Sequence, residues 1–224
     1  MTDLASTCAE IVRVARELAA RGLAVGTSGN VGARLADGRI AITPSSMPYE
    51  EMTPEDIVVV EPNGASADGR HRPSSELPIH LAVFAARPEV AAIVHTHSPF
   101  ATTFSAARRS IPAVHYVLAP LVAPGHDAIR VAPYATFGTE ALARHAVATL
   151  GEDQAVVLAN HGAMAVGRTL ESALGRAERI EELAMLAWRA EQIGGATFLT
   201  AEQLDEARDQ MARFPRQHGG RDPG

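Results

Sequence analysis

Three histidines are the residues of this sequence best suited to metal chemistry. His95 and His97 are two positions apart at the end of "EVAAIVHTH", residues 89–97, whose apolar run predicts a buried strand. Side chains two apart in a strand point to the same face, so both imidazoles can approach one ion. An open catalytic zinc site usually has three protein ligands. His161, which follows the apolar run "AVVLAN" and precedes Gly162, is the best third candidate. Packing or hydrogen bonding of the pair is the alternative explanation.

A carboxylate suited to acid/base work lies in "PSSE", residues 73–76. We expect Glu76 in the first turn of a helix, where the helix dipole favours its ionised form. The serines before it offer hydroxyl and free amide groups to a phosphate at the same helix N-terminus. An ordinary cap or surface charge is the alternative.

Two further loops have the same Gly, Ser and Thr character: "GTSGN", residues 26–30, and "TPSS", residues 43–46. Each is a plain turn by default. With "PSSE" they would form a cradle for a phosphomonoester if the fold brought them together. Tyr116 and Tyr134 could exchange a proton at a sugar oxygen, or they are partly buried aromatics with a satisfied hydroxyl group.

The elements that must position these residues alternate between helix and strand, which predicts one α/β domain over residues 1–214. Apolar spacing predicts six helices, over residues 3–20, 74–88, 98–109, 139–151, 169–195 and 200–214. We expect Ser98 to cap the third of them. Strands are expected within residues 22–35, 38–46, 56–62, 89–97, 129–138 and 154–167. Residues 111–123 are ambiguous, and residues 215–224 have the composition of a disordered tail.

Composition excludes several classes of function. The chain has 224 residues and a net charge of −6 without a basic block, so we expect no nucleic-acid partner. No apolar run approaches the roughly 18 residues that span a membrane, and residues 1–22 have the charges of an amphipathic helix rather than a signal peptide. The single cysteine, Cys8, suits a reducing compartment, so we expect a cytoplasmic protein. All twenty basic residues are Arg, which excludes lysine Schiff-base chemistry.

Taken together, seven motifs resemble the class II aldolase/adducin family, most of all its bacterial fuculose-phosphate aldolases. They are "GTSGN", "TPSSMPYEEM", "PSSE", "HTH", "IPAVHY", "APYATFGT" and "NHG", in the order typical of the family and spanning about residues 5–195. The resemblance implies a three-layer α/β fold, with a central mixed, mostly antiparallel sheet covered by helices on both faces. It also implies a homotetramer with each active site at a subunit boundary.

The resemblance further implies a role for each candidate residue. One zinc ion per subunit would be held by His95, His97 and His161, and Glu76 would be the acid/base. Tyr116 would act at the aldehyde oxygen in a neighbouring subunit's site. The phosphate pocket would comprise Thr27, Ser28, Gly29, Asn30, Ser45, Ser46, Ser74 and Ser75.

The implied activity is the cleavage of a ketose 1-phosphate of the L-fuculose 1-phosphate type. The C3–C4 bond would break, and zinc would stabilise the resulting enediolate as a Lewis acid. Glu76 would then return a proton to the enediolate, and the products would be dihydroxyacetone phosphate and a short aldehyde. The absence of lysine agrees with this metal-dependent route.

Departures from the family pattern concern the two ends of the substrate. Ser46 stands where fuculose-phosphate aldolases commonly have Gly, and residues 117–128 align only loosely. The family's C-terminal tyrosine has no match, since the nearest aromatic, Phe214, has no hydroxyl group. An aldolase for 5-deoxyribulose or 5-methylthioribulose 1-phosphate is therefore the main alternative.

Three other functions remain open within the family. Sister epimerases typically have Asp in place of Glu76, and sister dehydratases keep a similar metal site and glutamate. Adducin head domains are non-catalytic interaction modules without the metal ligands, whereas this chain has all three histidines.

Overall fold

A seven-stranded sheet forms the centre of the molecule. The computed structural model of the chain describes residues 4–66 and 70–214, so the expected tail over 215–224 lies outside the described residues. The strands lie in the order β3-β2-β1-β4-β9-β8-β7. Their bounds are β1 (Asn30–Arg34), β2 (Ile40–Ile42), β3 (Val58–Val60), β4 (Ala92–Thr96), β7 (Val131–Ala132), β8 (Ala155–Leu158) and β9 (Gly162–Gly167).

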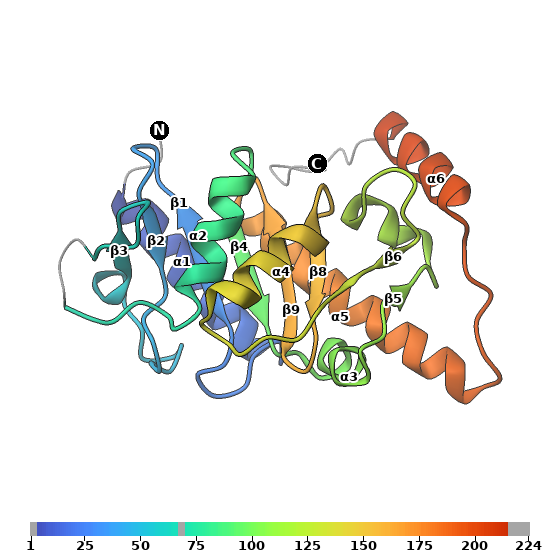
Figure 1. Cartoon of the computed structure of the whole chain (residues 1–224), viewed down its shortest axis with the longest axis horizontal. Helices are drawn as coiled ribbons and strands as arrows, with labels where there is room; N and C mark the ends of the chain where they lie inside the picture. The colour runs from blue at the N-terminus through green and yellow to red at the C-terminus, as the bar shows by residue number, and fades with distance from the viewer. Residues whose placement is uncertain (1–3, 67–69, 215–224) are drawn as a thin grey trace.

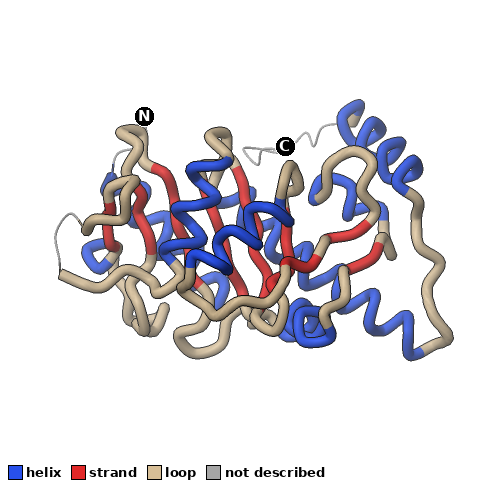
Figure 2. The backbone as a smooth tube through the Cα atoms, in the orientation of Figure 1, coloured by secondary structure: helices blue, strands red, loops and turns tan. Residues whose placement is uncertain are grey.

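The sheet is mixed and mostly antiparallel, as predicted. Neighbouring strands run antiparallel from β3 across to β8, and only β7 and β8 are parallel. The strands lie side by side through the middle of the molecule (Figure 2). Short apolar strands without strict alternation are typical of a sheet that is buried on both faces.

All six predicted helices are present, most of them a few residues shorter than expected. They are α1 (Leu4–Ala20), α2 (Leu77–Ala86), α3 (Pro99–Ala107), α4 (Glu140–Leu150), α5 (Leu170–Gln192) and α6 (Ala201–Arg213). The ambiguous residues 111–123 form strand β5 (Ile111–Pro112) and the 3-10 helix η2 (Tyr116–Leu121). β5 pairs with β6 (Ala128–Ile129) in a small separate sheet. A second 3-10 helix, η1 (Pro54–Asp56), precedes β3.

Apolar side chains from the two faces of the sheet enter two separate clusters. Ile93 and Met164 point toward α2 and α4, which pack against each other on one face (Figure 1). Val94 and Ala165 point the other way, into a cluster that includes α1, α3 and α5. The alternation along β4 follows from the two-residue period of a strand.

No helix within the described ranges is both long and apolar enough to cross a membrane.

The prediction that the Ser98 side chain caps α3 is wrong. Ser98 occupies the N-cap position, but its hydroxyl group makes no capping hydrogen bond. Instead, the Glu181 carboxylate on α5 accepts hydrogen bonds from the backbone N–H groups of Phe100 (2.9 Å) and Ala101 (2.8 Å). A carboxylate at a helix N-terminus satisfies free amides and also interacts favourably with the helix dipole.

Candidate active site

The three imidazoles converge at one end of the adjacent strands β4 and β9. His95 is the fourth residue of β4, His97 follows that strand directly, and His161 immediately precedes β9. Because Thr96 pairs with Ala163 in the antiparallel ladder, the last residues of β4 and the first residues of β9 lie side by side. The ring centroids are 4.8–4.9 Å apart, and the Nε2 atoms of His95 and His97 are 2.9 Å apart.

The surroundings of these rings suit metal ligation. His95 Nδ1 lies 2.9 Å from the carbonyl oxygen of Ala163 and donates to it, so Nε2, which faces His97 and Glu76, is the atom that would bind a metal ion. Burial and the neighbouring imidazoles lower the pKa of His97 to about 4, so its ring is neutral at neutral pH. Neutral imidazole is the form that binds a metal ion.

Glu76 points into the same cluster from the start of α2. It is the N-cap residue rather than a first-turn residue, and its side chain makes no capping bond. Its carboxylate oxygens lie 2.9 Å from His95 Nε2 and 3.0 Å from His161 Nε2. Burial raises the pKa of the Glu76 carboxyl group, but the two imidazoles outweigh burial and leave that pKa below its ordinary value. The candidate ligand atoms of Glu76 and the three histidines all lie within 4.8 Å of one another.

Two glycines allow the backbone to approach the cluster closely. A Cβ atom at Gly162 would overlap with the carbonyl oxygen of Thr96 and lie 2.9 Å from His97 Cδ2. A Cβ atom at Gly29 would lie 2.6 Å from the carbonyl oxygen of His95, and Gly29 also has a φ of 77°. Only a residue without a side chain fits either position.

Hydrogen bonds hold the three polar loops in place. Ser45 N donates to the carbonyl oxygen of Arg72 (2.9 Å), and Ser74 N donates to that of Thr43 (3.0 Å). The loop at residues 26–30 is held by Tyr49, whose hydroxyl group donates to the carbonyl oxygen of Ser28 over 3.0 Å. Main-chain pairing thus joins two loops of the predicted cradle, and the Tyr49 side chain holds the third.

These loops and the imidazole cluster line one cavity of about 340 Å³. Every residue expected in the phosphate pocket contributes to its wall, as do Glu76, His97 and His161. His95 is almost fully buried (1% exposed) behind them. Ser46 has a φ of 59°, a conformation that favours glycine. Its backbone thus explains why a glycine would suit this position.

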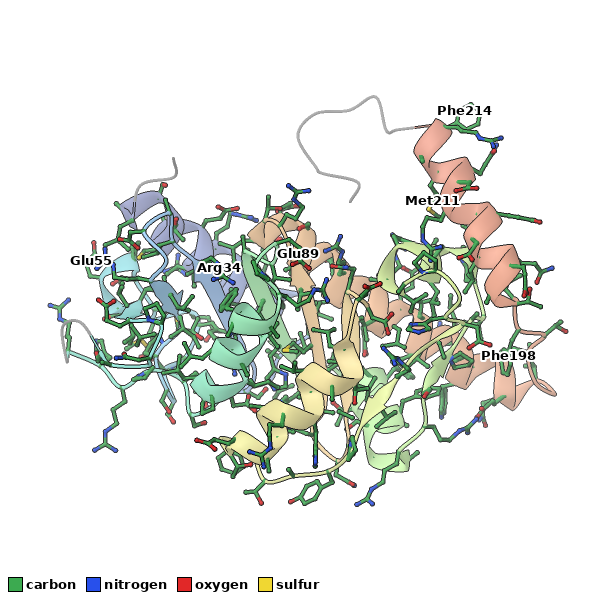
Figure 3. All side chains as sticks on the ribbon, turned by 45° about the horizontal axis from the view of Figure 1, so that its top comes forward. Arg34, Glu55, Glu89, Phe198, Met211 and Phe214 are labelled. Atoms are coloured by element: carbon green, nitrogen blue, oxygen red, sulfur yellow. The ribbon has the colours of Figure 1, made fainter. Side chains whose placement is uncertain are left out.

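Two candidate residues are placed differently from the rest. Tyr116 does not line the cavity; it is 52% exposed at the start of η2. The Asn30 side chain does line it, but its amide is engaged with two protein groups, Glu76 and His80. Phe214 is also outside the cavity lining, at the outer end of α6, and is 72% exposed (Figure 3).

Five cavity residues were not assigned to the site from the sequence: Pro44, Tyr134, Ala135, Phe137 and Asn160. Tyr134 was considered only as a proton donor or a packed aromatic. Asn160 adopts a φ of 53° in the turn before His161 and accepts a hydrogen bond from Arg108 Nε (2.8 Å). The sequence feature that could have identified Asn160 is its place in "NHG", directly before the candidate ligand His161.

The sequence matches the family described as Class II Aldolase and Adducin N-terminal domain over residues 9–188. The chain belongs to this family. It is 41% identical over 204 residues to the 5-methylthioribulose-1-phosphate/5-deoxyribulose-1-phosphate aldolase of Rhodospirillum rubrum, covering 91% of this chain and 90% of that protein. It is 42% identical over 184 residues to the L-fuculose phosphate aldolase of Escherichia coli, covering 82% and 80%.

A solved structure of L-fuculose 1-phosphate aldolase superimposes with a TM-score of 0.86 at 32% identity. The match covers 92% of this chain and 96% of that one. The predictions of the family, of its fold and of an enzyme of the class II aldolase type are thereby confirmed. The names of these two relatives contain the two substrate types that the sequence left open, 5-deoxyribulose or 5-methylthioribulose phosphate and fuculose phosphate.

Proposed function

We propose that the chain is a metal-dependent aldolase that cleaves a ketose 1-phosphate to dihydroxyacetone phosphate and a short aldehyde. The observation that carries this proposal is a single cavity with two chemically distinct ends. Three imidazoles and a carboxylate lie at one end, and three Ser- and Thr-containing loops lie at the other. This arrangement fits a substrate with a phosphate next to a carbonyl group.

The donor set suits zinc, with His95, His97 and His161 as the ligands. Three imidazole ligands form the type of site that leaves a coordination position for substrate. When bound, the ion would supply Lewis-acid stabilisation of the negative charge that develops on the substrate's oxygen atoms.

The remaining roles belong to the protein's own side chains. The serine loops hold the phosphate through their hydroxyl groups, at the N-terminus of α2, where the helix dipole favours an anion. Glu76, ionised in the free site and aimed at the cluster, takes up the proton that leaves the C4 hydroxyl group as the C3–C4 bond breaks, and then delivers it to C3 of the departing dihydroxyacetone phosphate. Tyr116 is exposed and lies outside its own cavity, so we assign it to the aldehyde oxygen in a second copy's site.

Two substrates fit this proposal, and they differ at the aldehyde end. L-Fuculose 1-phosphate gives a hydroxylated aldehyde, whereas 5-deoxyribulose 1-phosphate gives acetaldehyde. The cavity wall contributed by Tyr134, Ala135 and Phe137 is largely apolar, which favours an aldehyde with an apolar tail. The relative with a 5-methylthioribulose- and 5-deoxyribulose-phosphate name also covers more of this chain. We therefore retain the deoxyribulose type as a second candidate.

The proposal extends to the organisation of the protein. Residues 1–214 would form one three-layer domain, which the two apolar clusters on opposite faces of the sheet support. Four copies would assemble with each site at a boundary between them, in keeping with the exposure of Tyr116. The cytoplasm is the proposed location, supported by Cys8, which is buried and free of any disulfide.

The direct test is release of dihydroxyacetone phosphate from each ketose phosphate, with zinc and with a chelator. Chelator-sensitive release from either substrate is expected, and the ratio of the two rates identifies the aldehyde end. Zinc-loaded protein that releases no product from either substrate would contradict the proposal and favour the dehydratase or epimerase branch.

A further inference from the structure

His80 is a buried histidine that lies outside the imidazole cluster. It is on α2, four residues after Glu76, so the two side chains share one face of the helix start. No part of the residue is exposed to solvent. Strand β1 makes room for the ring at Gly32, where a Cβ atom would lie 2.5 Å from His80 Nδ1 and 3.0 Å from Cε1. A glycine is therefore needed opposite His80.

Two hydrogen bonds connect His80 to Glu76 through the buried amide of Asn30. His80 Nε2 lies 2.5 Å from Asn30 Oδ1, and Asn30 Nδ2 donates to Glu76 Oε2 over 2.8 Å. An amide oxygen can only accept, so the first bond requires a proton on Nε2. His80 Nδ1 is then unprotonated, and it has no hydrogen-bond partner in the described part of the chain.

The reversed orientation of the amide is unfavourable at both of its ends. It would set the Asn30 carbonyl oxygen against the ionised Glu76 carboxylate, so that two acceptors would face each other. It would also move the ring proton to His80 Nδ1, leaving a buried N–H group without an acceptor. Burial and the nearby His95 lower the pKa of His80 to about 3, so its ring carries one proton at neutral pH.

We propose that His80 is a positioning residue: it fixes the direction of the Asn30 amide, which in turn holds the Glu76 carboxylate toward the cavity. An imidazole that holds a metal ion through Nε2 has no proton on that atom to donate. Asn30 is therefore a donor to Glu76 that metal binding does not remove. The kinetic consequence rests on the proposed aldolase function, whereas the hydrogen-bond direction does not.

Three variants of α2 test the kinetic consequence. His80→Leu removes the donor, and His80→Gln keeps an N–H group near the position of Nε2. Ile79→Val is the control, because Ile79 is buried on the same helix but belongs to the apolar cluster. We expect His80→Leu to lower kcat about 10–100-fold with an unchanged KM and full zinc content. His80→Gln should recover most of that loss, and Ile79→Val should behave as wild type.

A measurement on metal-free wild-type protein tests the hydrogen-bond direction without any turnover. Nitrogen NMR of labelled histidine should show the His80 proton on Nε2 at neutral and mildly acid pH. The Asn30 side-chain amide protons should exchange slowly with solvent in wild type and rapidly in His80→Leu. If His80→Leu does not fold, Gly32→Ala replaces it, since the added Cβ atom displaces the ring, and the same losses are expected.

Either of two results would overturn the proposal. One is a proton on Nδ1 of His80, and the other is a zinc-loaded His80→Leu with the kcat of the Ile79→Val control. A wild type that cleaves neither ketose phosphate would refute the proposed function instead. The NMR measurements would then still support or overturn the hydrogen-bonded chain.

Discussion

Replacing Gly162 with Ala tests whether the close approach of β9 to β4 is what brings the imidazoles together. The added Cβ atom would lie 2.9 Å from His97 Cδ2, while ordinary contact begins at 3.4 Å. The ring must therefore move by about 0.5 Å, which exceeds the roughly 0.2 Å within which metal–ligand distances are held. The overlap with the Thr96 carbonyl oxygen forces a costly shift of the backbone as well, directly before His97. We expect zinc affinity to fall about 10–100-fold, and kcat at limiting zinc to fall with it.

The assay is a competition titration of zinc against a chromophoric chelator, followed by activity at each zinc concentration. Gly175→Ala is the matched control, because Gly175 lies within α5 and an added Cβ atom meets nothing within 4 Å. It should leave zinc affinity unchanged and raise the free energy of unfolding by up to about 1 kcal/mol. A folded Gly162→Ala protein with wild-type zinc affinity would refute the geometric reasoning.

Three further predictions follow from the site and its supports. Glu76→Gln should retain zinc, by metal analysis, and lower kcat about 10²–10⁴-fold; near-normal turnover would remove Glu76 from the mechanism. Glu181→Ala leaves two backbone N–H groups of α3 without their acceptor and should lower the free energy of unfolding in urea by about 2–4 kcal/mol. Its neighbour Glu182, which is 45% exposed, should cost less than about 1 kcal/mol when replaced by Ala. In metal-free protein, His80 takes up a proton near pH 6.5 when unfolded but only near pH 3 when folded. The free energy of unfolding should therefore fall as pH drops through that window, by up to about 1.4 kcal/mol per pH unit. Urea unfolding at several pH values should show a shallower dependence for His80→Gln, and an equal dependence would contradict the assignment.

Local patterns in the sequence predict the elements of this fold well. The apolar spacing of α1 and α5 and the uninterrupted apolar runs of β4 and β8 each depend only on near neighbours in the chain. The histidine pair on β4 is predictable for the same reason, since a two-residue spacing always gives one face. His161 is the best third candidate from its place after an apolar run and before Gly162, and the resemblance, which covers most of the chain, implies the same assignment.

Features that depend on contacts between distant segments could not be predicted. Glu181 caps α3 from about eighty residues further along the chain, so Ser98 was the only candidate visible locally. The partners of the Asn30 amide depend on how α2 packs on β1. His80 is exposed or buried according to that same packing, so its burial could not be predicted from the sequence.

The pairing of β1 with β4 also disfavours wrong alignments of the two strands, because each strand has a polar side chain at the paired position. Asn30 lies directly opposite His95 in this ladder, with both side chains on the face that α2 covers. A slip of one residue in either strand would turn its polar side chain toward the apolar cluster beneath α1 and α5. Each misaligned sheet would then bury an amide or an imidazole without a partner, at a cost of roughly 1–3 kcal/mol each. The groups that serve chemistry in the native sheet thus penalise its wrong alignments during folding.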